Sequence, residues 1–255
     1  MTRKVVIDFF PESVHRYDEG YAVVAIDVIR ATTTLATAVS MGRRCFPAPS
    51  LEEVRRVAMR LRNPLLAGEL GGVIPRGFEI NNSPAEIAVR KDISRPLILL
   101  SSSGTKLIHL AGACEAAYIA CFRNCHFLAR YLCDRHPCIA LIGAGSRGQR
   151  REEDKMCCAW MARDLLESGY SAENRETDEI VERWSGVNTN IISVGPSAHY
   201  LLQSGQGRDL AFILTHIADL EWGFTLRGDE VVGFTDTEDE VIRSGTAFRT
   251  GRVCG

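Results

Sequence analysis

Short aliphatic runs of strand length recur along this chain, and most of them alternate with segments whose apolar residues repeat at helical spacing. Such alternation is typical of an α/β fold, because parallel strands need a crossover element between them. We therefore predict a layered α/β/α architecture with a mixed, largely parallel sheet. The predicted strands are Lys4–Phe9, Ala22–Ile29, Pro64–Ala67, Pro96–Leu100, Ala116–Ala120, Cys138–Ile142, Ile191–Val194 and Glu230–Phe234.

The predicted helices lie between these runs, with Gly or Pro at most of their boundaries. They are Thr33–Met41, Ser50–Arg62, Thr105–Ala111, Asn124–Arg135, Glu153–Ser168, Thr177–Ser185, Ser197–Ser204 and Asp209–Asp219. A chain of 255 residues can bury a core of this kind without disulfides or structural metal ions. We expect a single domain over residues 1–255, with residues 135–140 as the candidate boundary between two similar halves built from weak strand–turn–helix repeats.

Charge and hydropathy exclude several classes of partner. The formal net charge is −2 and the Lys and Arg residues are scattered, so we expect neither a nucleic-acid nor a membrane partner. No segment approaches the roughly 18 apolar residues of a membrane span, and the apolar run at the N-terminus is too short for a signal peptide. We expect a cytoplasmic protein, and a homo-oligomer is compatible with this composition.

Nine cysteines are present, most of them in apolar or helical contexts. In a reducing compartment such residues are expected to be ordinary buried thiols. The densest group, Cys121, Cys125 and His126, lacks the paired C-x-x-C spacing of a structural zinc site. We therefore expect no metal there.

Three apolar runs end in turns rich in hydroxyl or glycine residues that precede a helix. Their sequences are VVAIDVIRATTTLATAVSMG, LILLSSSGTKLIHLAGA and CIALIGAGSRGQRREEDK. In open α/β sheets the ligand binds outside the carboxyl ends of the strands, so these turns are predicted to converge on one crevice. The alternative is that their Ser, Thr and Gly residues serve only as helix caps and turn residues.

Turns of this kind suit an anionic ligand, and phosphate is the expected guest. Backbone N–H groups at helix starts and Ser or Thr hydroxyls donate hydrogen bonds to anions. The candidate hydroxyl donors to the substrate are Thr32, Thr33, Thr34, Ser103 and Thr105.

Asp27 and Arg30 follow the first of these strands and are the candidate catalytic residues. Arg30 has the planar guanidinium that can clamp a phosphate or sulfonate in a bidentate contact. Asp27 lies beside the predicted anion pocket, where a carboxylate would bind a cation or move a proton. An Asp27–Arg30 ion pair, or a turn cap, is the structural alternative.

A divalent cation fits the distribution of acidic residues. Mg²⁺ takes one or two carboxylates together with phosphate oxygens and waters. Asp27, Glu69 after a short predicted strand, and Asp154 at the start of the long helix are the candidate metal ligands. Acidic residues at that helix start also complement the helix dipole without any metal, which is the alternative for Asp154.

Several phosphoryl-transfer classes are excluded by missing motifs. The chain has no G-x-x-x-x-G-K-[ST] loop, no cysteine-phosphatase loop and no second Asp two residues after Asp27. The GAGSRG segment at Gly143–Gly148 matches G-x-G-x-x-G, but a charged run follows it and no acidic strand end lies some twenty residues further on. A dinucleotide site is therefore not expected.

Taken together, these residues resemble the 2-phosphosulfolactate phosphatase family, Mg²⁺-dependent enzymes of coenzyme M biosynthesis. The matching segments are Asp27 to Thr34, Gly68 with Glu69, Gly77 to Pro84, Ser103 to Thr105, Gly143 to Gly145, and Glu153 with Asp154. The resemblance implies an α/β fold of the family's own type and hydrolysis of a phosphate monoester on a small sulfonated or carboxylated hydroxy acid. It adds Asn82, Ser83, Gly104 and Gly145 to the residues expected to bind the substrate.

The resemblance also shows departures. The family often has Asn where this chain has Ser103, and the C-terminal third keeps a trace of the pattern in Ser197, Leu201, Gly205, Asp209 and Asp219. A substrate with both a phosphate and a sulfonate calls for cations besides Arg30. The candidates are Arg76, Arg123, Arg147 and Arg150.

The predicted reaction is Mg²⁺-dependent hydrolysis of 2-phosphosulfolactate to sulfolactate and phosphate by an attacking water. A phosphoenzyme on Asp27 is an alternative route. Two other functions stay open at this point: a phosphatase for another small 2-phosphorylated carboxylic acid, and a non-catalytic binder of a small phosphorylated or sulfonated anion.

Overall fold

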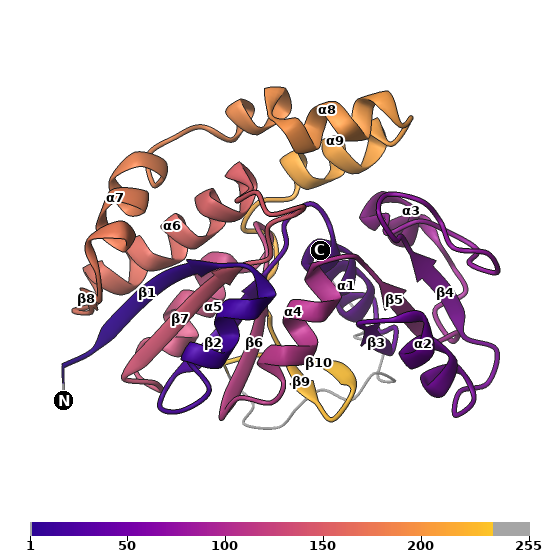
Figure 1. The fold of residues 1–255 in the computed structure, drawn as a ribbon, viewed down its shortest axis with the longest axis horizontal. Helices are drawn as coiled ribbons and strands as arrows, with labels where there is room; N and C mark the ends of the chain where they lie inside the picture. Colours follow the sequence, from indigo (N-terminus) through magenta and orange to yellow (C-terminus); the bar gives the residue numbers. More distant parts are fainter. Residues whose placement is uncertain (1, 237–255) are drawn as a thin grey trace, which may run out of the picture.

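The computed structural model describes residues 2–236, and its centre is a ten-stranded mixed sheet (Figure 1). The strand order is β4-β5-β3-β10-β9-β6-β2-β7-β1-β8. The strands are β1 (Lys4–Phe9), β2 (Ala22–Ile26), β3 (Cys45–Ala48), β4 (Leu65–Gly68), β5 (Leu97–Leu100), β6 (Ala116–Ala120), β7 (Cys138–Gly143), β8 (Ser171–Ala172), β9 (Gly223–Arg227) and β10 (Glu230–Phe234).

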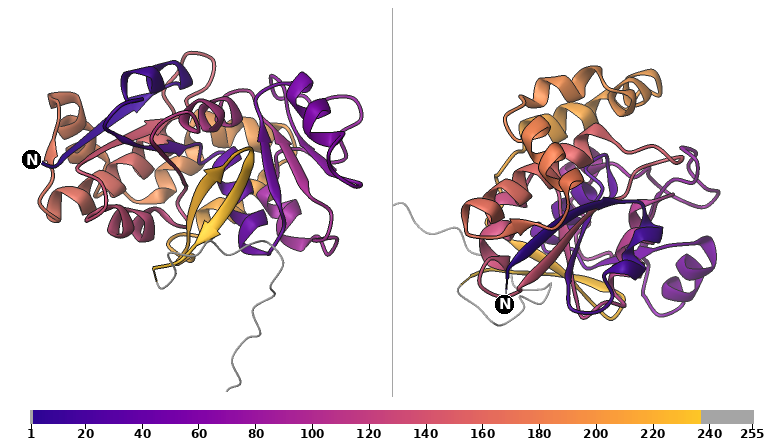
Figure 2. Two further views of the ribbon diagram at one scale, coloured as in Figure 1. Left: turned by 90° about the horizontal axis from the view of Figure 1, so that it is seen from below. Right: turned by 60° about the vertical axis from the view of Figure 1, so that its left-hand side comes forward.

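Two parallel blocks make up most of this sheet. Strands β4, β5 and β3 form one block, and β6, β2, β7, β1 and β8 form the other. The antiparallel hairpin β9–β10 lies between them, as the left view of Figure 2 shows. Only Val231 and Cys45 pair between β10 and β3, so the ladder is short where the blocks meet. The prediction of a mixed, largely parallel sheet is confirmed.

Helices cover both faces of the sheet. They are α1 (Ala31–Ser40), α2 (Leu51–Ala58), α3 (Pro84–Val89), α4 (Gly104–Ala111), α5 (Cys125–Leu132), α6 (Glu152–Glu167), α7 (Arg175–Trp184), α8 (Pro196–Gln203) and α9 (Gly207–Thr215), with 3₁₀ turns η1 (Pro11–Arg16) and η2 (Thr189–Val194). Alternate residues of β2 enter different apolar clusters: Val24 and Ile26 pack with α5 and α6, while Val23 and Ala25 pack with α1 and α4. A strand buried on both faces explains the unbroken apolar run in the sequence, and the layered α/β/α prediction is confirmed.

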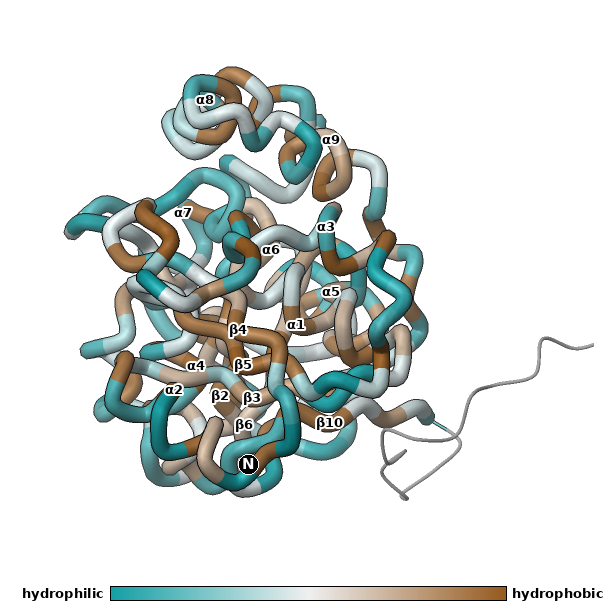
Figure 3. Tube along the Cα trace, turned by 90° about the vertical axis from the view of Figure 1, so that its right-hand side faces the viewer, coloured by the Kyte–Doolittle hydropathy of each residue, from teal (hydrophilic) through white to brown (hydrophobic). Residues whose placement is uncertain are grey.

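Residues 189–215, which we call the cap segment, form η2, α8 and α9 outside these layers. The segment lies at the top of Figures 1 and 3, and α9 packs against α3. Its own small apolar cluster contains Ala198, Leu201 and Leu210. The hydropathy colouring of Figure 3 places hydrophobic residues in the sheet beneath it.

The strand prediction fails at four places, one of which is the two-residue strand β8, which pairs with β1 and was not predicted. The predicted strand Ile191–Val194 is the 3₁₀ turn η2, where Asn188 caps the turn and Pro196 begins the next helix. Strands β3 and β9 were not predicted, because β3 contains Pro47 and β9 begins with Gly223, residues with weak strand preference. Both exist because they pair with predicted strands, β3 with β5 and β9 with β6.

The candidate boundary at residues 135–140 lies beside paired strands. β7 begins at Cys138 and pairs with both β1 and β2 from the first half of the chain. The predicted single domain includes residues 1 and 237–255, which lie outside the described residues, as does Cys254. The other eight cysteines are free thiols. No helix in the described part of the chain is long and apolar enough to span a membrane.

Candidate active site

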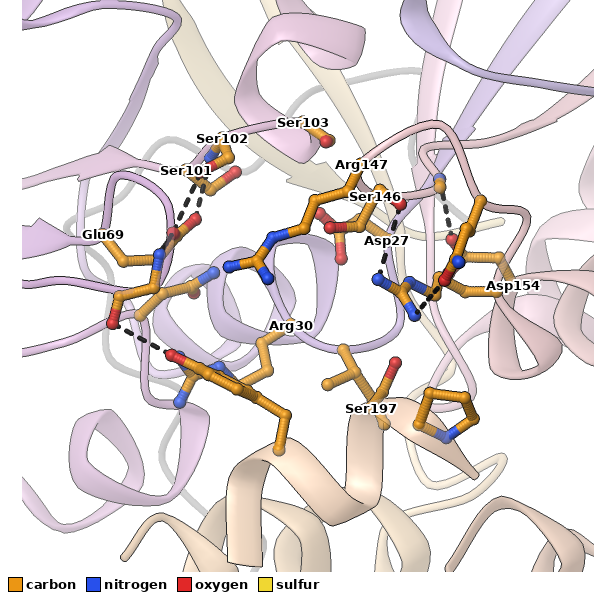
Figure 4. Close-up of a pocket in the computed structure, with 18 of the residues that line it drawn as sticks. Asp27, Arg30, Glu69, Ser101, Ser102, Ser103, Ser146, Arg147, Asp154 and Ser197 are labelled. Carbon is orange, nitrogen blue, oxygen red and sulfur yellow. Dashed lines mark hydrogen bonds between the residues drawn. The ribbon is translucent and has the colours of Figure 1, made fainter. Parts of the chain in front are cut away.

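A cavity of about 470 Å³ lies where the carboxyl ends of β2, β4, β5 and β7 meet the cap segment. The three turns that were predicted to converge all reach it. Its lining residues are Asp27, Ile29, Arg30, Glu69, Gly71, Gly72, Asn82, Ser101, Ser102, Ser103, Gly145, Ser146, Arg147, Gln149, Arg151, Asp154, Pro196, Ser197, Tyr200 and Leu201. This volume suits a small ligand, and Figure 4 shows how the polar side chains surround it.

Asp27 is the first residue after β2, and its side chain is only 8% exposed. Burial, and then the negative charge of Glu69, raises the pKa of Asp27 to about 7; a hydrogen bond from the backbone N–H of Ala31 acts in the opposite direction. Gly104 makes room for the carboxylate, since a Cβ at that position would lie 2.0 Å from Asp27 Oδ2. The predicted substrate residue Gly104 therefore acts as a spacer beside Asp27.

Asp154 lies in the first turn of α6 and joins two of the converging turns. Its carboxylate accepts hydrogen bonds from the backbone N–H of Val28 at 2.9 Å and of Gly145 at 3.2 Å. Burial and the charges of Asp27 and Glu153 hold the pKa of Asp154 well above its usual value. Glu153 is also buried, and its Oε1 has no hydrogen-bond partner in the described residues. We call Asp27, Glu153 and Asp154 the acidic cluster.

The threonine hydroxyls after β2 face the protein itself. Thr32 Oγ1 accepts from Asp27 N at 3.0 Å and donates to Asp27 O at 2.7 Å, while Thr33 Oγ1 donates to Val28 O at 2.8 Å. Thr34 Oγ1 is buried without a hydrogen-bond partner in the described residues. None of the three lines the cavity, so the geometry favours the alternative in which these residues serve the turn itself.

The serine turn after β5 faces the cavity more openly. Ser101, Ser102 and Ser103 line it, and Ser103 makes no side-chain hydrogen bond within the described residues. Thr105 resembles Thr32: its Oγ1 accepts from Ser101 N and donates to Ser101 O, both at 3.0 Å. The Ser103 hydroxyl therefore has no partner among the described residues and can donate to a ligand.

Glu69, a predicted metal ligand, is occupied by donors from the protein. Its Oε1 accepts from Ser102 N at 2.8 Å, and its Oε2 accepts from Ser102 Oγ at 3.0 Å and from Gly72 N at 2.6 Å. Figure 4 shows this carboxylate beside the serine turn, across the cavity from Asp154. The geometry gives Glu69 a part in holding the loop that forms the rim of the cavity.

Arg30 forms its ion pair with Asp209 of α9, at 2.6 Å, and not with Asp27. The same guanidinium donates to Gln206 at 2.5 Å and to Asn81 at 3.1 Å. Asp209 also accepts from Ser83 Oγ at 2.5 Å. These contacts connect the β2 turn, the loop before α3 and the cap segment.

Asn82 and Ser83 belong to the loop that opens α3. Asn82 lines the cavity, and its buried Oδ1 has no hydrogen-bond partner in the described residues. Ser83 caps α3, because its hydroxyl accepts from Glu86 N at 3.1 Å. Of these two predicted substrate residues, the structure places Asn82 in the cavity wall.

The four arginines proposed as additional cations occupy different places. Arg147 lines the cavity, whereas Arg123 pairs with Asp219 and Arg150 with Glu176. Arg76 is not among the lining residues. Arg151, which the sequence did not single out, also lines the cavity.

The cap segment supplies lining residues that sequence reasoning missed. Tyr200 donates from its hydroxyl to Gly72 O at 2.9 Å, and Pro196 precedes the lining residue Ser197. Nothing in the local pattern marks Tyr200, which occupies an ordinary position on an amphipathic helix. Ser197 and Leu201, which carried the faint family trace, do line the cavity.

The described part of the chain contains no group of three or more His, Cys, Asp or Glu residues arranged to hold a metal ion. Asp27 and Asp154 nevertheless interact electrostatically, because the negative charge of Asp27 contributes to the raised pKa of Asp154. These two predicted metal ligands therefore lie together, and Glu69 is turned toward its own loop.

Comparison with known proteins agrees with this geometry. Residues 8–219 match the family model described as 2-phosphosulpholactate phosphatase. A probable 2-phosphosulfolactate phosphatase of Pseudothermotoga lettingae is 32% identical over 158 residues, covering 62% of this chain and 66% of the relative. One from Carboxydothermus hydrogenoformans is 34% identical over 152 residues, covering 59% and 63%. One from Symbiobacterium thermophilum is 30% identical over 202 residues, covering 76% and 86%.

The matched segment thus spans slightly less than two thirds of the length of the first two relatives and most of the third. The family match covers every turn that lines the cavity, from the β2 turn to the cap segment. The chain belongs to the 2-phosphosulpholactate phosphatase family.

Proposed function

We propose that this protein hydrolyses the phosphate monoester of 2-phosphosulfolactate to sulfolactate and phosphate, with Mg²⁺ as cofactor. The observation that carries the proposal is the pair of buried carboxylates, Asp27 and Asp154, in the wall of a small cavity that serines and arginines also line. Family membership supports the same reaction.

The residues present fit a magnesium ion. Asp27 and Asp154 offer carboxylate oxygens, and the Oδ1 of Asn82 is a buried acceptor without a partner in the described residues. Oxygen ligands of this kind suit Mg²⁺. Burial and nearby negative charges raise the pKa of both carboxyls, and a cation would offset those charges. When bound, Mg²⁺ would supply positive charge to the phosphate oxygens.

The chain's own groups would bind the phosphate and direct the attacking water. The hydroxyls of Ser103 and Ser146 face the cavity and can donate to phosphate oxygens. A carboxylate of the acidic cluster orients the water and takes its proton as the water oxygen bonds to phosphorus. The ester P–O bond then breaks, and the departing oxygen of sulfolactate takes up a proton. Direct attack by Asp27 on phosphorus is the alternative route.

Arg30 has a positioning role in this proposal. Its charge is already balanced by Asp209, and its guanidinium connects the β2 turn to the cap segment. It therefore holds the loop that carries Asp27 and keeps the cap segment over the cavity. This role differs from the direct phosphate contact that the sequence predicted.

The test is phosphate release, with and without Mg²⁺, from a panel of phosphate esters. The panel holds 2-phosphosulfolactate, 2-phosphoglycolate, 2- and 3-phosphoglycerate, phosphoenolpyruvate and p-nitrophenyl phosphate. We expect Mg²⁺-dependent release with a strong preference for the sulfonate. If only the carboxylated esters are hydrolysed, the phosphatase reaction stands and the proposed substrate is wrong. If the protein binds these esters without releasing phosphate, it is an anion binder and the enzyme assignment is wrong.

A further inference from the structure

Arg147 occupies the tip of a tight turn after β7 in a conformation that arginine rarely adopts. Ser146 and Gln149 exchange two backbone hydrogen bonds of 2.9 Å, and the two residues between them have positive φ values, +50° for Arg147 and +70° for Gly148. Two-residue turns of this kind favour Asn-Gly or Asp-Gly, because both central residues are left-handed. A side chain that breaks this local preference beside a cavity is a candidate for function.

The charge of Arg147 is not neutralised by an ion pair within the described residues. In the part of the chain that the structure describes, its guanidinium donates one hydrogen bond, from Nη2 to the backbone oxygen of Gly71 at 3.2 Å. Arg30 and Arg150, by contrast, form ion pairs with Asp209 and Glu176. In Figure 4 the guanidinium of Arg147 extends over the cavity, between Asp27 and Glu69.

Arg147 also lies at the boundary between two cavities. With Ser102, Ser103 and Ser146, it lines both the main cavity and an adjoining one of about 620 Å³ that contains Lys106. Arg147 faces the same cavity as Asp27 and Asp154, so one small ligand with two acidic groups could place its phosphate beside the carboxylates and its second group beside Arg147. The guanidinium there offers parallel N–H donors that match the oxygens of a second acidic group.

We propose that Arg147 binds the sulfonate of the substrate and so selects phosphate esters that carry a second, strongly acidic group. This inference rests on the proposed function and specifies how that site recognises its substrate. A phosphate monoester without a second anion would not use Arg147. Selectivity between the two kinds of ester is therefore the property that Arg147 controls.

The deciding variant is Arg147→Asn, because Asn is the residue that this turn prefers and the variant should fold with a Tm at or above that of the wild type. We expect the KM for 2-phosphosulfolactate to rise by about 10- to 100-fold with little change in kcat, as for loss of a charged hydrogen-bonded contact. The kcat/KM for p-nitrophenyl phosphate should stay within about twofold. Arg147→Lys should restore part of the sulfonate selectivity, since it keeps the charge without the planar fork.

Arg76→Gln is the matched control, because Arg76 is an exposed arginine that the sequence offered equally as an additional cation and that lines neither cavity. It should leave both substrates unaffected. Equal losses on both substrates in Arg147→Asn, or no loss on either, would overturn the assignment.

The two proposals can fail separately. If the wild type hydrolyses only p-nitrophenyl phosphate, the sulfonate assignment is overturned and the phosphatase reaction stands. If it hydrolyses neither ester, the proposed function fails. Calorimetric binding of 2-phosphosulfolactate to the wild type and to Arg147→Asn then tests whether Arg147 contacts this ligand. Binding at least tenfold weaker in Arg147→Asn would support the contact, and unchanged binding would overturn it.

Discussion

The β2–α1 turn and the β5–α4 turn share one hydroxyl contact, although they differ in length by one residue and in the side chain that follows the strand. In each, a threonine hydroxyl at the start of the helix bonds to the N–H and C=O of the first residue after the strand: Thr32 to Asp27, and Thr105 to Ser101. Asp27 brings a buried carboxylate to the cavity, whereas Ser101 accepts a hydrogen bond from its own turn, from Thr105 N at 3.0 Å. The repeated hydroxyl pattern therefore shapes the turn, and the single residue at the strand end determines its chemistry.

Exchanging that one residue should have the largest effect. Asp27→Asn should lower kcat by about 10²- to 10⁴-fold, because it removes the ionised group that orients water and holds the cation. The metal-free variant should be at least as stable as the wild type, since it no longer buries an ionisable group among other acids. Steady-state phosphate release and urea unfolding measure the two effects.

Ser101→Ala is the partner variant in the other turn. It should retain activity within about tenfold, because Ser101 Oγ bonds to its own turn. If Asp27→Asn keeps wild-type activity, or if the two variants lose equal activity, the two turns do not differ in their catalytic role.

The second largest difference between the two turns should be in the pH dependence of protein stability. The pKa of Asp27 is raised from 3.8 to about 7 in the folded protein, so between these values the folded state binds more protons than the unfolded state. The free energy of unfolding of the metal-free protein should therefore fall by about 2–4 kcal/mol as the pH rises from 4 to 7, and this contribution should become constant about one pH unit above the folded pKa.

The measurement is urea unfolding in a chelator across this pH range, for the wild type and Asp27→Asn. Subtracting the Asp27→Asn curve from the wild-type curve leaves the contribution of Asp27. It removes the contributions of other titrating groups, such as Asp92, whose pKa is lowered by hydrogen bonds from Arg90 and Arg43. A difference curve that rises with pH would contradict the buried, repelled state of Asp27.

Much of the fold was predictable from local pattern. Strands buried on both faces appear as continuous apolar runs, so β2 and β5 could be found from the sequence alone. β3 and β9 could not, because a proline and a glycine weaken their local preference and only pairing with neighbouring strands specifies them. The Ile191–Val194 prediction was wrong because a short apolar run has no strand character without a partner strand.

The site was predictable where position along a strand carries the information. Asp27, Ser103 and Gly145 follow strand ends, and the structure places all three in the cavity wall. The threonines could not be assigned from the pattern, because a capping hydroxyl and a ligand-binding hydroxyl occupy the same position after a strand. Tyr200 and Arg151 reach the cavity only through tertiary packing.

Removing the shaping hydroxyls should have a smaller effect that both turns share. Thr32→Val and Thr105→Val should each lower the free energy of unfolding by about 1–3 kcal/mol, because each leaves a buried strand-end N–H or C=O without its partner. Only Thr32→Val should also lower kcat, since its hydroxyl holds the backbone of Asp27. Equal stability with a selective rise in KM would instead identify these hydroxyls as substrate donors.

The smallest effect, with the opposite sign, is expected at Thr34. It lies two positions after Thr32 in the same helix, equally buried, but its Oγ1 has no hydrogen-bond partner in the described residues. Thr34→Val keeps the shape, exchanges residues of similar helix preference and removes a desolvated hydroxyl, so the free energy of unfolding should rise by about 0.5–1 kcal/mol. Urea unfolding beside Thr32→Val makes the comparison within one helix. A loss of stability or a raised KM in Thr34→Val would show that this hydroxyl contacts a ligand or a buried water, which would return one threonine of the β2 turn to the phosphate-binding role that the sequence predicted.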